Sequence, residues 1–372
     1  MTKVPAEIKE FTQLKPWWRT EVPTEIVLSE NGVGDLLAKI EKENRKPFFI
    51  IDNVLEDQKP FEKIFAQKQK FLFNASESEP RTSDVDQLVA LIKTLPEQPD
   101  VIVGVGGGAT MDLAKATGIC LGNPLPAASY QGYSLDMNKG KDIWVLPALS
   151  GTGAEITPIA VLRGPEKKLG INDPHTEPNV AVIDPQLSSG AKKFNRFFTM
   201  MDCYFHHFEI TKSKTSKPDA IKDAEDGLRM SREVLGNDLA EYKLDRAIES
   251  AMASVLGGSS TIGGRVGASH AISYGLSNSG PKLPHSVAVT IAMLAMEDLY
   301  PEGYADTVKF LEINGMPRPT AKEYGIGPDQ IEKMTKTALG MEKLWHSYFG
   351  DDWKEKTTKP FIEEIYKKIV SA

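Results

Sequence analysis

The sequence has few of the features typical of secreted or membrane-spanning chains. Only two of its 372 residues are cysteines, Cys120 and Cys203. Both fall in apolar segments, so we interpret them as free core thiols in a reducing compartment, not as a disulfide or a zinc site. No stretch approaches the roughly 20 apolar residues that a membrane span requires. Residues 1–25 contain charges and prolines without a long apolar run, which argues against a signal peptide.

Basic residues are in the minority. The chain has 44 Lys+Arg against 51 Asp+Glu, a formal net charge of −7, and no basic run. This balance argues against a nucleic-acid partner. A hydrophobic content of 41% and a charged content of 26% are typical of a globular protein. We therefore expect a cytoplasmic protein with neither a nucleic-acid nor a membrane partner.

Strand-like and helix-like segments alternate in the first half of the chain. The predicted strands are 26–28, 47–51, 70–73, 100–105, 143–147, 156–161, 168–171 and 180–183. The predicted helices among them are 35–44, 58–69 and 83–95. Such alternation is typical of an α/β domain with a parallel sheet covered on both faces.

The pattern changes after Ser189, where helical segments take over. The predicted helices are 194–210, 218–235, 241–280, 285–298, 304–313, 328–349 and 359–370. A chain of this length is too long for one ordinary core. We therefore predict an α/β domain of residues 1–189 and an all-α domain of residues 190–372.

Consecutive glycines follow the strand at 100–105. Gly106, Gly107 and Gly108 precede a helix that opens near Met111. Glycines let backbone N–H groups approach an anion closely, and a helix N-terminus adds about half a positive charge. This context favours a pyrophosphate site, although the spacing is that of neither the G-x-G-x-x-G fingerprint nor a P-loop. A tight strand-to-helix turn without a ligand is the alternative.

A second loop follows the strand at 143–147. It is small and rich in hydroxyl groups, with Ser150 and Thr152 separated by one glycine. Such a loop can also line a nucleotide, and an ordinary turn is the alternative.

The most informative stretch is an apolar helix at 197–209 that contains Asp202 and His206. Four residues apart, the two side chains project from the same face of the helix. A buried carboxylate costs several kcal/mol unless it is paired or bound to a metal. The pair can present one oxygen and one nitrogen to a metal ion, or form a core hydrogen bond. His207 points to a different face, and we interpret it as a packing or supporting residue.

Two further histidines of the helical half have a suggestive context. His270 follows a run of small residues, and His285 stands at a predicted helix start. With Asp202 and His206 they would complete a set of three nitrogens and one oxygen. His175 and His346 lack such a context, and we interpret them as structural or surface residues.

Taken together, these motifs resemble the iron-containing, or group III, alcohol dehydrogenases. The resemblance rests on Gly104–Lys115, Pro147–Glu155, the Asp202-x-x-x-His206 pair, His270 and His285. It implies a Rossmann-like dinucleotide-binding domain and a helical metal-binding domain (a dehydroquinate synthase-like fold), with the active site in the cleft between them. It also implies NAD, one divalent metal ion (Fe²⁺ or Zn²⁺) and a homodimer.

The resemblance also assigns roles to residues. The expected NAD-binding residues are Asp52, Gly106, Gly107, Gly108, Ala109, Asp112, Ser150, Thr152 and Lys168. Asp202, His206, His270 and His285 would bind the metal. The metal would lower the pKa of the substrate hydroxyl, and the nicotinamide would accept the hydride. Many family members have a further histidine, credited with proton relay, where this chain has Tyr274, and Tyr274 could take part in such a relay.

The branch that oxidises carbon 8 of 3-deoxy-D-manno-octulosonate is the most similar, on stretches such as Tyr300–Gly303. Arg265, among small residues five positions before His270, could hold a sugar-acid carboxylate or simply reach solvent. A short-chain alcohol or diol dehydrogenase is one alternative. A dehydroquinate synthase-like lyase and a nucleotide-binding module without catalysis are the others.

Overall fold

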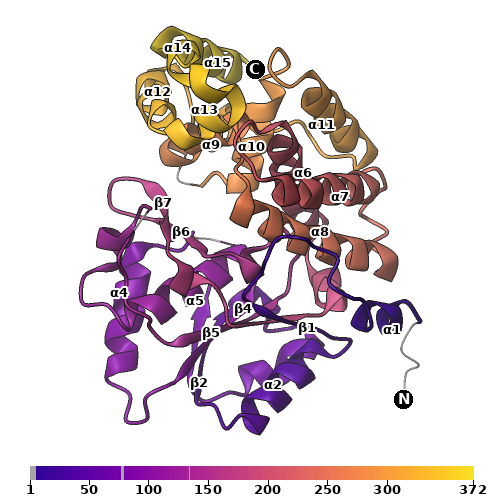
Figure 1. The fold of residues 1–372 in the computed structure, drawn as a ribbon, viewed down its shortest axis with the longest axis vertical. Helices are drawn as coiled ribbons and strands as arrows, with labels where there is room; N and C mark the ends of the chain where they lie inside the picture. Colours follow the sequence, from indigo (N-terminus) through magenta and orange to yellow (C-terminus); the bar gives the residue numbers. More distant parts are fainter. Residues whose placement is uncertain (1–5, 77–78, 134, 281) are drawn as a thin grey trace. The chain divides into compact units, whose positions relative to one another are not determined.

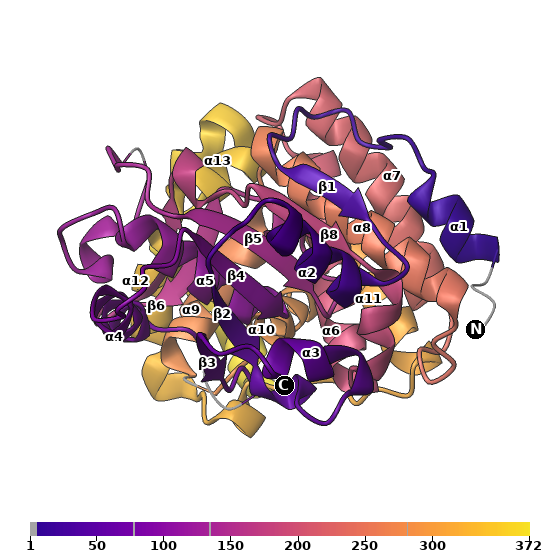
Figure 2. The same ribbon diagram turned by 90° about the horizontal axis from the view of Figure 1, so that it is seen from below.

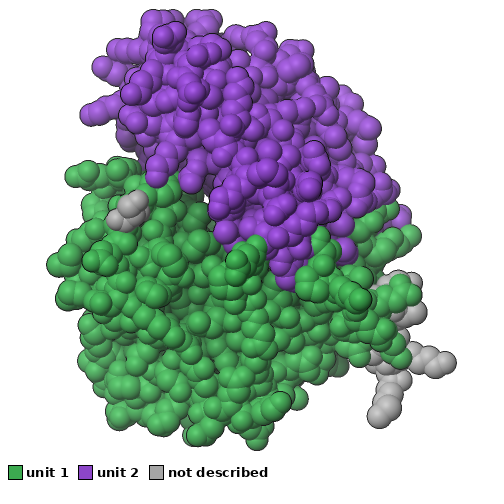
Figure 3. All heavy atoms as spheres, in the orientation of Figure 1, with its two compact units in different colours: residues 1–17, 21–191, 243–251 green, residues 18–20, 192–242, 252–372 purple. Residues whose placement is uncertain are grey.

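The computed structural model describes residues 6–76, 79–133, 135–280 and 282–372 (Figure 1). The start of the N-terminal arm and Pro281 of the predicted loop before His285 lie outside these ranges. By its contacts the chain divides into two compact units, coloured separately in Figure 3. The first comprises Met1–Trp17, Glu21–Ala191 and Lys243–Ala251, and the second comprises Trp18–Thr20, Lys192–Tyr242 and Met252–Ala372. No helix among the described residues is long and apolar enough to cross a membrane.

The first unit is built on a six-stranded parallel sheet. Its order is β1 (Glu25–Leu28), β8 (Val180–Ile183), β5 (Asp142–Pro147), β4 (Val101–Gly106), β2 (Pro47–Asp52) and β3 (Lys70–Phe73). The central strands are continuous apolar runs because both of their faces are covered. The prediction of a parallel α/β sheet is confirmed.

Helices cover both faces of this sheet. Phe48 and Ile50 of β2 belong to an apolar cluster with residues of α4 (Thr82–Lys93) and α5 (Gly108–Cys120). Phe49 and Ile51 belong to a second cluster with residues of α2 (Gly32–Lys42). Successive side chains of a strand point to opposite faces, so the two clusters are the two sides of the sheet (Figure 2).

Some local predictions for this half are wrong. The helix predicted at 58–69 is only a 3₁₀ turn at Lys59–Phe61 and one turn of α3 (Glu62–Phe65), because the polar residues that follow offer no apolar face to bury. The strand predicted at 156–161 is β6 (Ile159–Arg163), which begins after Pro158 and pairs antiparallel with β7 (Lys168–Asn172). A short helix, α1 (Ala6–Thr12), lies in the arm where no periodicity was evident.

The second unit is helical, as predicted. Its helices are α6 (Lys193–Lys212), α7 (Pro218–Leu235), most of α8 (Leu244–Gly263), α9 (Ala268–Ser279), α10 (His285–Leu294), α11 (Pro301–Ile313), α12 (Ile331–Leu339), α13 (Glu342–Phe349), α14 (Trp353–Lys356) and α15 (Lys359–Ser371). They enclose one apolar core, to which α6 contributes the fully buried Phe197, Tyr204 and Phe205.

The helix predicted at 241–280 is interrupted at residues 264–267. A side chain at Gly264 would place its Cβ 2.5 Å from the carbonyl oxygen of Ser260. At Gly267 the Cβ would lie 2.7 Å from the hydroxyl oxygen of Tyr300. Larger residues would therefore clash at these two positions of the turn, and glycine fits there.

Candidate active site

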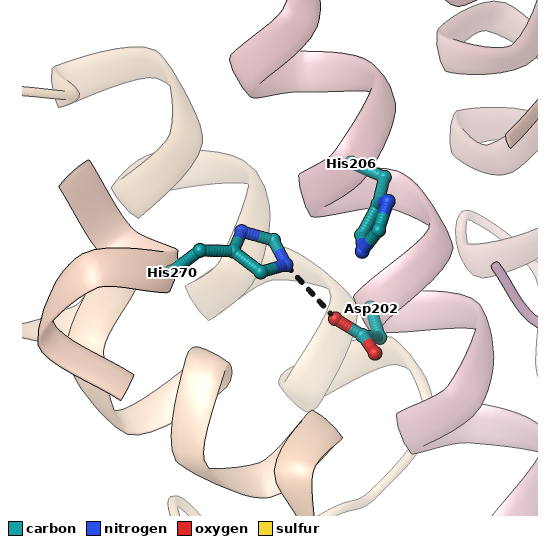
Figure 4. Close-up of side chains that lie close together, drawn as sticks. All are labelled: Asp202, His206 and His270. Carbon is teal, nitrogen blue, oxygen red and sulfur yellow. Dashed lines mark ion pairs between the residues drawn. The ribbon is translucent and has the colours of Figure 1, made fainter. Parts of the chain in front are cut away.

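The helix α6 brings Asp202 and His206 to the same face, as their spacing predicts. Twelve of its 20 residues are buried, so the helix lies in the core and not on the surface. Figure 4 shows both side chains leaving this helix toward His270, which comes from α9. A hydrogen-bond contact of 3.4 Å between Nδ1 of His206 and Oγ1 of Thr261 leaves the other ring nitrogen for the site.

Three of the four predicted metal ligands converge. Asp202, His206 and His270 each offer one ligand atom, and these atoms lie within 4.8 Å of one another. Oδ1 of Asp202 is 3.4 Å from Nε2 of His270 (dashed in Figure 4). The rings of His206 and His270 stand edge to face, with their centroids 4.6 Å apart.

The buried polar atoms of this cluster fit a metal ion. Oδ1 of Asp202 and Nε2 of His270 are buried and have no hydrogen-bond partner among the described residues. Such orphaned groups are costly unless something binds them. One carboxylate and imidazole nitrogens form a donor set that suits iron or zinc.

The protonation states of two of these groups are those of metal ligands. Burial opposes the charge of Asp202, but the charge of His285 and contact with His270 hold its pKa below the usual range. Burial and the charge of His270 lower the pKa of His206 to about 3, so this imidazole is neutral at pH 7. Metal binding requires an ionised carboxylate and a neutral imidazole.

The fourth predicted ligand, His285, is adjacent to the three but not within their cluster. It is the first residue of α10, and its ring centroid is 5.8 Å from that of His270. Tyr274 lies one turn after His270 on α9, and its ring centroid is also 5.8 Å from that of His285. Both side chains are half-buried beside the cluster.

His207 faces away from this cluster, as predicted. Its Nε2 is 3.1 Å from the carbonyl oxygen of Ala253, and its side chain is fully buried. Burial lowers its pKa to about 4. Cys203 and Cys120 are buried, and neither forms a disulfide among the described residues, in agreement with their interpretation as core thiols.

Sequence reasoning assigned no role to Glu209, which contacts the cluster from behind. Its carboxylate is 2.5 Å from Nδ1 of His270. The available signal was its position, three residues after His206 and seven after Asp202, on the same face of a buried helix. Burial opposes protonation of His270, but the charge of Glu209 raises the pKa of His270 to about 9.

In the first unit, the predicted NAD-binding residues stand at one edge of the sheet. The strands β2, β4 and β5 are adjacent and parallel, so their carboxyl ends meet there. Asp52 ends β2, the glycine loop follows β4, and the loop with Ser150 and Thr152 follows β5. The carboxyl edge of a parallel sheet is where such folds bind nucleotides.

The glycine loop has the geometry of an anion site. Gly107 is the N-cap of α5 and makes no side-chain cap hydrogen bond. A Cβ at Gly107 or Gly108 would have no neighbour closer than 3.9 Å, so the space over this backbone is open. The first N–H groups of α5 therefore lie at a helix N-terminus that a pyrophosphate can approach.

Two of the other predicted NAD-binding residues are held by protein groups. Asp112 accepts a hydrogen bond from the backbone N–H of Val161 at 3.0 Å and is 3.4 Å from Nζ of the buried Lys115. Lys168, in β7, forms an ion pair with Glu79. Ser150, Thr152 and Ala109 are half-buried in their loops.

Arg265 lies in the break between α8 and α9, not within a helix. Its backbone N–H donates to Oγ of Ser216 at 3.0 Å, and its carbonyl accepts from Oγ of Ser347 at 2.8 Å. Its backbone is thus fixed five residues before His270, and its side chain is half-buried.

Comparisons with known proteins agree with this arrangement. A family model described as iron-containing alcohol dehydrogenase matches residues 23–185. Choline dehydrogenase of Bacillus subtilis (strain 168) is 26% identical over 307 residues, covering 72% of this chain and 74% of that protein. The 1,3-propanediol dehydrogenase of Klebsiella pneumoniae is 29% identical over 264 residues, which cover 68% of this chain and 67% of that protein. The fold is also similar to a solved structure, that of sulfoacetaldehyde reductase from Bifidobacterium kashiwanohense in complex with NAD⁺. The TM-score is 0.80 at 19% identity, and the match covers 96% of this chain and 100% of that one.

One unit has the parallel-sheet edge at which such folds bind dinucleotides, and the other has a cluster of side chains that could hold a metal ion. Residues 23–185 match the iron-containing alcohol dehydrogenase family, and the chain is similar to alcohol dehydrogenases over about two thirds of its length. It is an NAD-dependent alcohol oxidoreductase, and its cofactors are NAD and a divalent metal ion. The family match ends at residue 185, so the cluster around Asp202 is an observation independent of it.

Proposed function

We propose that Asp202, His206 and His270, completed by His285, hold the divalent metal of a primary-alcohol dehydrogenase. The supporting observation is the convergence of three possible ligand atoms, two of which are buried and have no hydrogen-bond partner in the described part of the chain. In this proposal residues 1–189 bind NAD and residues 190–372 bind the metal and the substrate. The protein would act in the cytoplasm as a homodimer.

The reaction converts a primary alcohol to an aldehyde. It removes a hydride from carbon, which NAD⁺ accepts, and a proton from oxygen, which leaves to solvent. When bound, the metal supplies the positive charge that makes the substrate hydroxyl acidic near neutral pH. Asp202 and the histidines orient the ion, and Tyr274, beside His285, passes the proton outward.

On the NAD side, we assign the pyrophosphate to Gly106, Gly107, Gly108 and Ala109, and the ribose to Asp52. The open backbone at the start of α5 supports this assignment. Ser150 and Thr152 line the cofactor directly. Asp112 already contacts Val161, and Lys168 already pairs with Glu79. These contacts favour a supporting role, in which the two residues hold the sheet of β6 and β7 beside the glycine loop.

Two substrate classes are the candidates. The first is a sugar acid such as 3-deoxy-D-manno-octulosonate, in which case Arg265 would bind the carboxylate and the pathway would be lipopolysaccharide biosynthesis. The second is a short-chain alcohol or diol, which is favoured by the name of the 1,3-propanediol dehydrogenase relative. Iron and zinc both suit the ligand set.

A substrate panel tests this function. The purified chain and Arg265→Ala are assayed for NADH formation with sugar acids, neutral sugars, short-chain alcohols and diols. If a sugar acid is the substrate, it gives the highest kcat/KM. Arg265→Ala then raises its KM by roughly 10-fold or more, because a charge-assisted hydrogen bond to the carboxylate is lost. Small neutral alcohols should be unaffected by this substitution, which makes them the internal control.

The panel also has outcomes against the proposal. If small neutral alcohols exceed every sugar acid, or if Arg265→Ala leaves the sugar-acid KM unchanged, the sugar-acid assignment fails and the alcohol dehydrogenase remains. If no primary alcohol in the panel reduces NAD⁺, the proposed primary-alcohol chemistry itself fails.

A further inference from the structure

Glu209 occupies an environment that ordinary helix packing does not explain. Its side chain is fully buried, in a helix whose other buried residues are mostly apolar. The carboxylate nevertheless accepts from Nδ1 of His270 (2.5 Å), from the backbone N–H of Gly267 (2.9 Å) and from the backbone N–H of Ser269 (2.7 Å). A buried charge is tolerated only when it is satisfied in this way.

Tyr300 completes this arrangement from α11. Its hydroxyl accepts from the backbone N–H of Ala268 at 3.1 Å, and both this hydroxyl and the Glu209 carboxylate lie against Gly267. The start of α9 has no side-chain cap of its own, so a carboxylate from α6 and a phenol from the start of α11 take that place. Gly267 allows this packing, because a Cβ there would lie 2.7 Å from the Tyr300 hydroxyl.

This arrangement fixes the orientation of the His270 ring. Because Nδ1 donates to Glu209, the other nitrogen, Nε2, faces Oδ1 of Asp202 across 3.4 Å. In metal sites, a carboxylate on the second nitrogen of a histidine sets its tautomer and strengthens it as a ligand. The helix α6 thus supplies two ligands and, one turn further on, the group that orients the third.

Resting on the proposed function, we propose that Glu209, supported by Tyr300, is a positioning residue that sets the metal affinity of this chain through His270. Glu209 binds neither metal nor substrate. A carboxylate that only capped α9 would make the same contacts with Gly267 and Ser269, so the test must separate metal affinity from stability.

The experiment measures zinc affinity on the full chain. Metal-stripped wild type, Glu209→Gln and Tyr300→Phe are titrated with Zn²⁺ against a chromophoric chelator, and bound zinc per chain is counted by elemental analysis. Thermal unfolding of the stripped proteins gives stability separately. Glu209→Gln is expected to bind one zinc about 10- to 100-fold more weakly. Tyr300→Phe is expected to weaken binding several-fold, roughly the effect of one lost hydrogen bond.

Two matched variants serve as controls. Glu302→Gln makes the same change at a half-exposed glutamate that pairs with Arg232 and Lys212. Tyr366→Phe removes a buried hydrogen bond to the carbonyl of Ile272 in α9 without touching Glu209. Both should bind zinc within about twofold of the wild type, even where Tyr366→Phe unfolds at a lower temperature.

The outcomes separate this inference from the proposed function. If Glu209→Gln unfolds earlier but binds zinc as tightly as the wild type, Glu209 is only a cap and the inference fails alone. If Glu209→Gln does not fold, equal zinc affinity of Tyr300→Phe and Tyr366→Phe overturns it. If the wild type itself binds no zinc at one per chain, the proposed metal site fails, and the inference fails with it.

Discussion

At the residue scale, Asp52 combines a structural contact with a position suited to cofactor selection. It is 7% exposed, and its carboxylate accepts from the backbone N–H of Val54 at 3.3 Å, so it caps the turn after β2. A Cβ placed on Gly106 would lie 2.8 Å from the Cβ of Asp52, so Asp52 adjoins the glycine loop. A carboxylate here can bind ribose hydroxyls and repel a 2′-phosphate.

We therefore expect a higher kcat/KM with NAD than with NADP. Asp52→Asn should lower the ratio of these two values roughly tenfold. Asparagine keeps the size and the cap acceptor, so stability should change by less than about 1 kcal/mol. Asp52→Gly should narrow the preference as well, at a greater cost in stability. The measurement is kcat/KM for both cofactors, and equal values in the wild type would contradict the role of Asp52.

Local patterns identified some site residues and missed others for physical reasons. Asp202 and His206 were recognisable because a helix repeats its faces every three to four residues. Glu209 has the same periodicity, but a single acid at the end of an apolar run is usually a solvent-facing helix end. Its role depends on His270, which is 61 residues away, and a contact of that separation leaves no local pattern.

At the element scale, strands were predicted more accurately than helix ends. The strands β2, β4 and β5 are continuous apolar runs between polar residues, so their bounds are visible in the sequence. The break between α8 and α9 was missed because Gly257 and Gly258 continue within α8, whereas Gly264 does not. At Gly264 a Cβ would lie 2.5 Å from the carbonyl oxygen of Ser260, a close approach that belongs to the tertiary structure and leaves no sequence pattern.

The glycine loop after β4 gives a prediction at this scale. Gly106 has φ +154°, and a Cβ there would meet Asp52 and Thr110 at 2.8 and 2.9 Å. Gly106→Ala should therefore lower the free energy of unfolding by about 1–3 kcal/mol. The nearest described atoms to the Cβ of Gly107→Ala would be those of Leu149 at 3.9 Å, an ordinary contact distance, so this substitution should leave stability nearly unchanged.

The two variants differ in what they test. Because the Cβ of Gly107→Ala would occupy the space proposed for the pyrophosphate, the KM for NAD should rise by roughly tenfold, about the free energy of one lost hydrogen bond to a charge. Denaturant unfolding and NAD titration measure the two effects. An unchanged KM in Gly107→Ala would place the pyrophosphate elsewhere.

At the scale of the whole molecule, the chain passes between the two units more than once. Residues 18–20 belong with the helical unit because buried Asp223 accepts from the backbone N–H groups of Arg19 (2.8 Å) and Thr20 (3.0 Å). Asp223 also accepts from Oγ of Ser259 at 3.0 Å. The contacts with Arg19 and Thr20 join segments about 200 residues apart, so no local pattern in the sequence indicates them.

The central claim is that one metal ion, held by the Asp202 cluster, is required for NAD-linked alcohol oxidation. The most direct measurement is NADH formation by the metal-stripped chain as Fe²⁺ or Zn²⁺ is added back, with bound metal counted in the same samples. We predict no turnover without metal, recovery in proportion to bound metal up to one ion per chain, and no recovery in Asp202→Ala or His270→Ala. His346→Ala, at an exposed histidine that contacts Asp351, should recover as the wild type does. Full turnover by a demonstrably metal-free wild type would contradict the account.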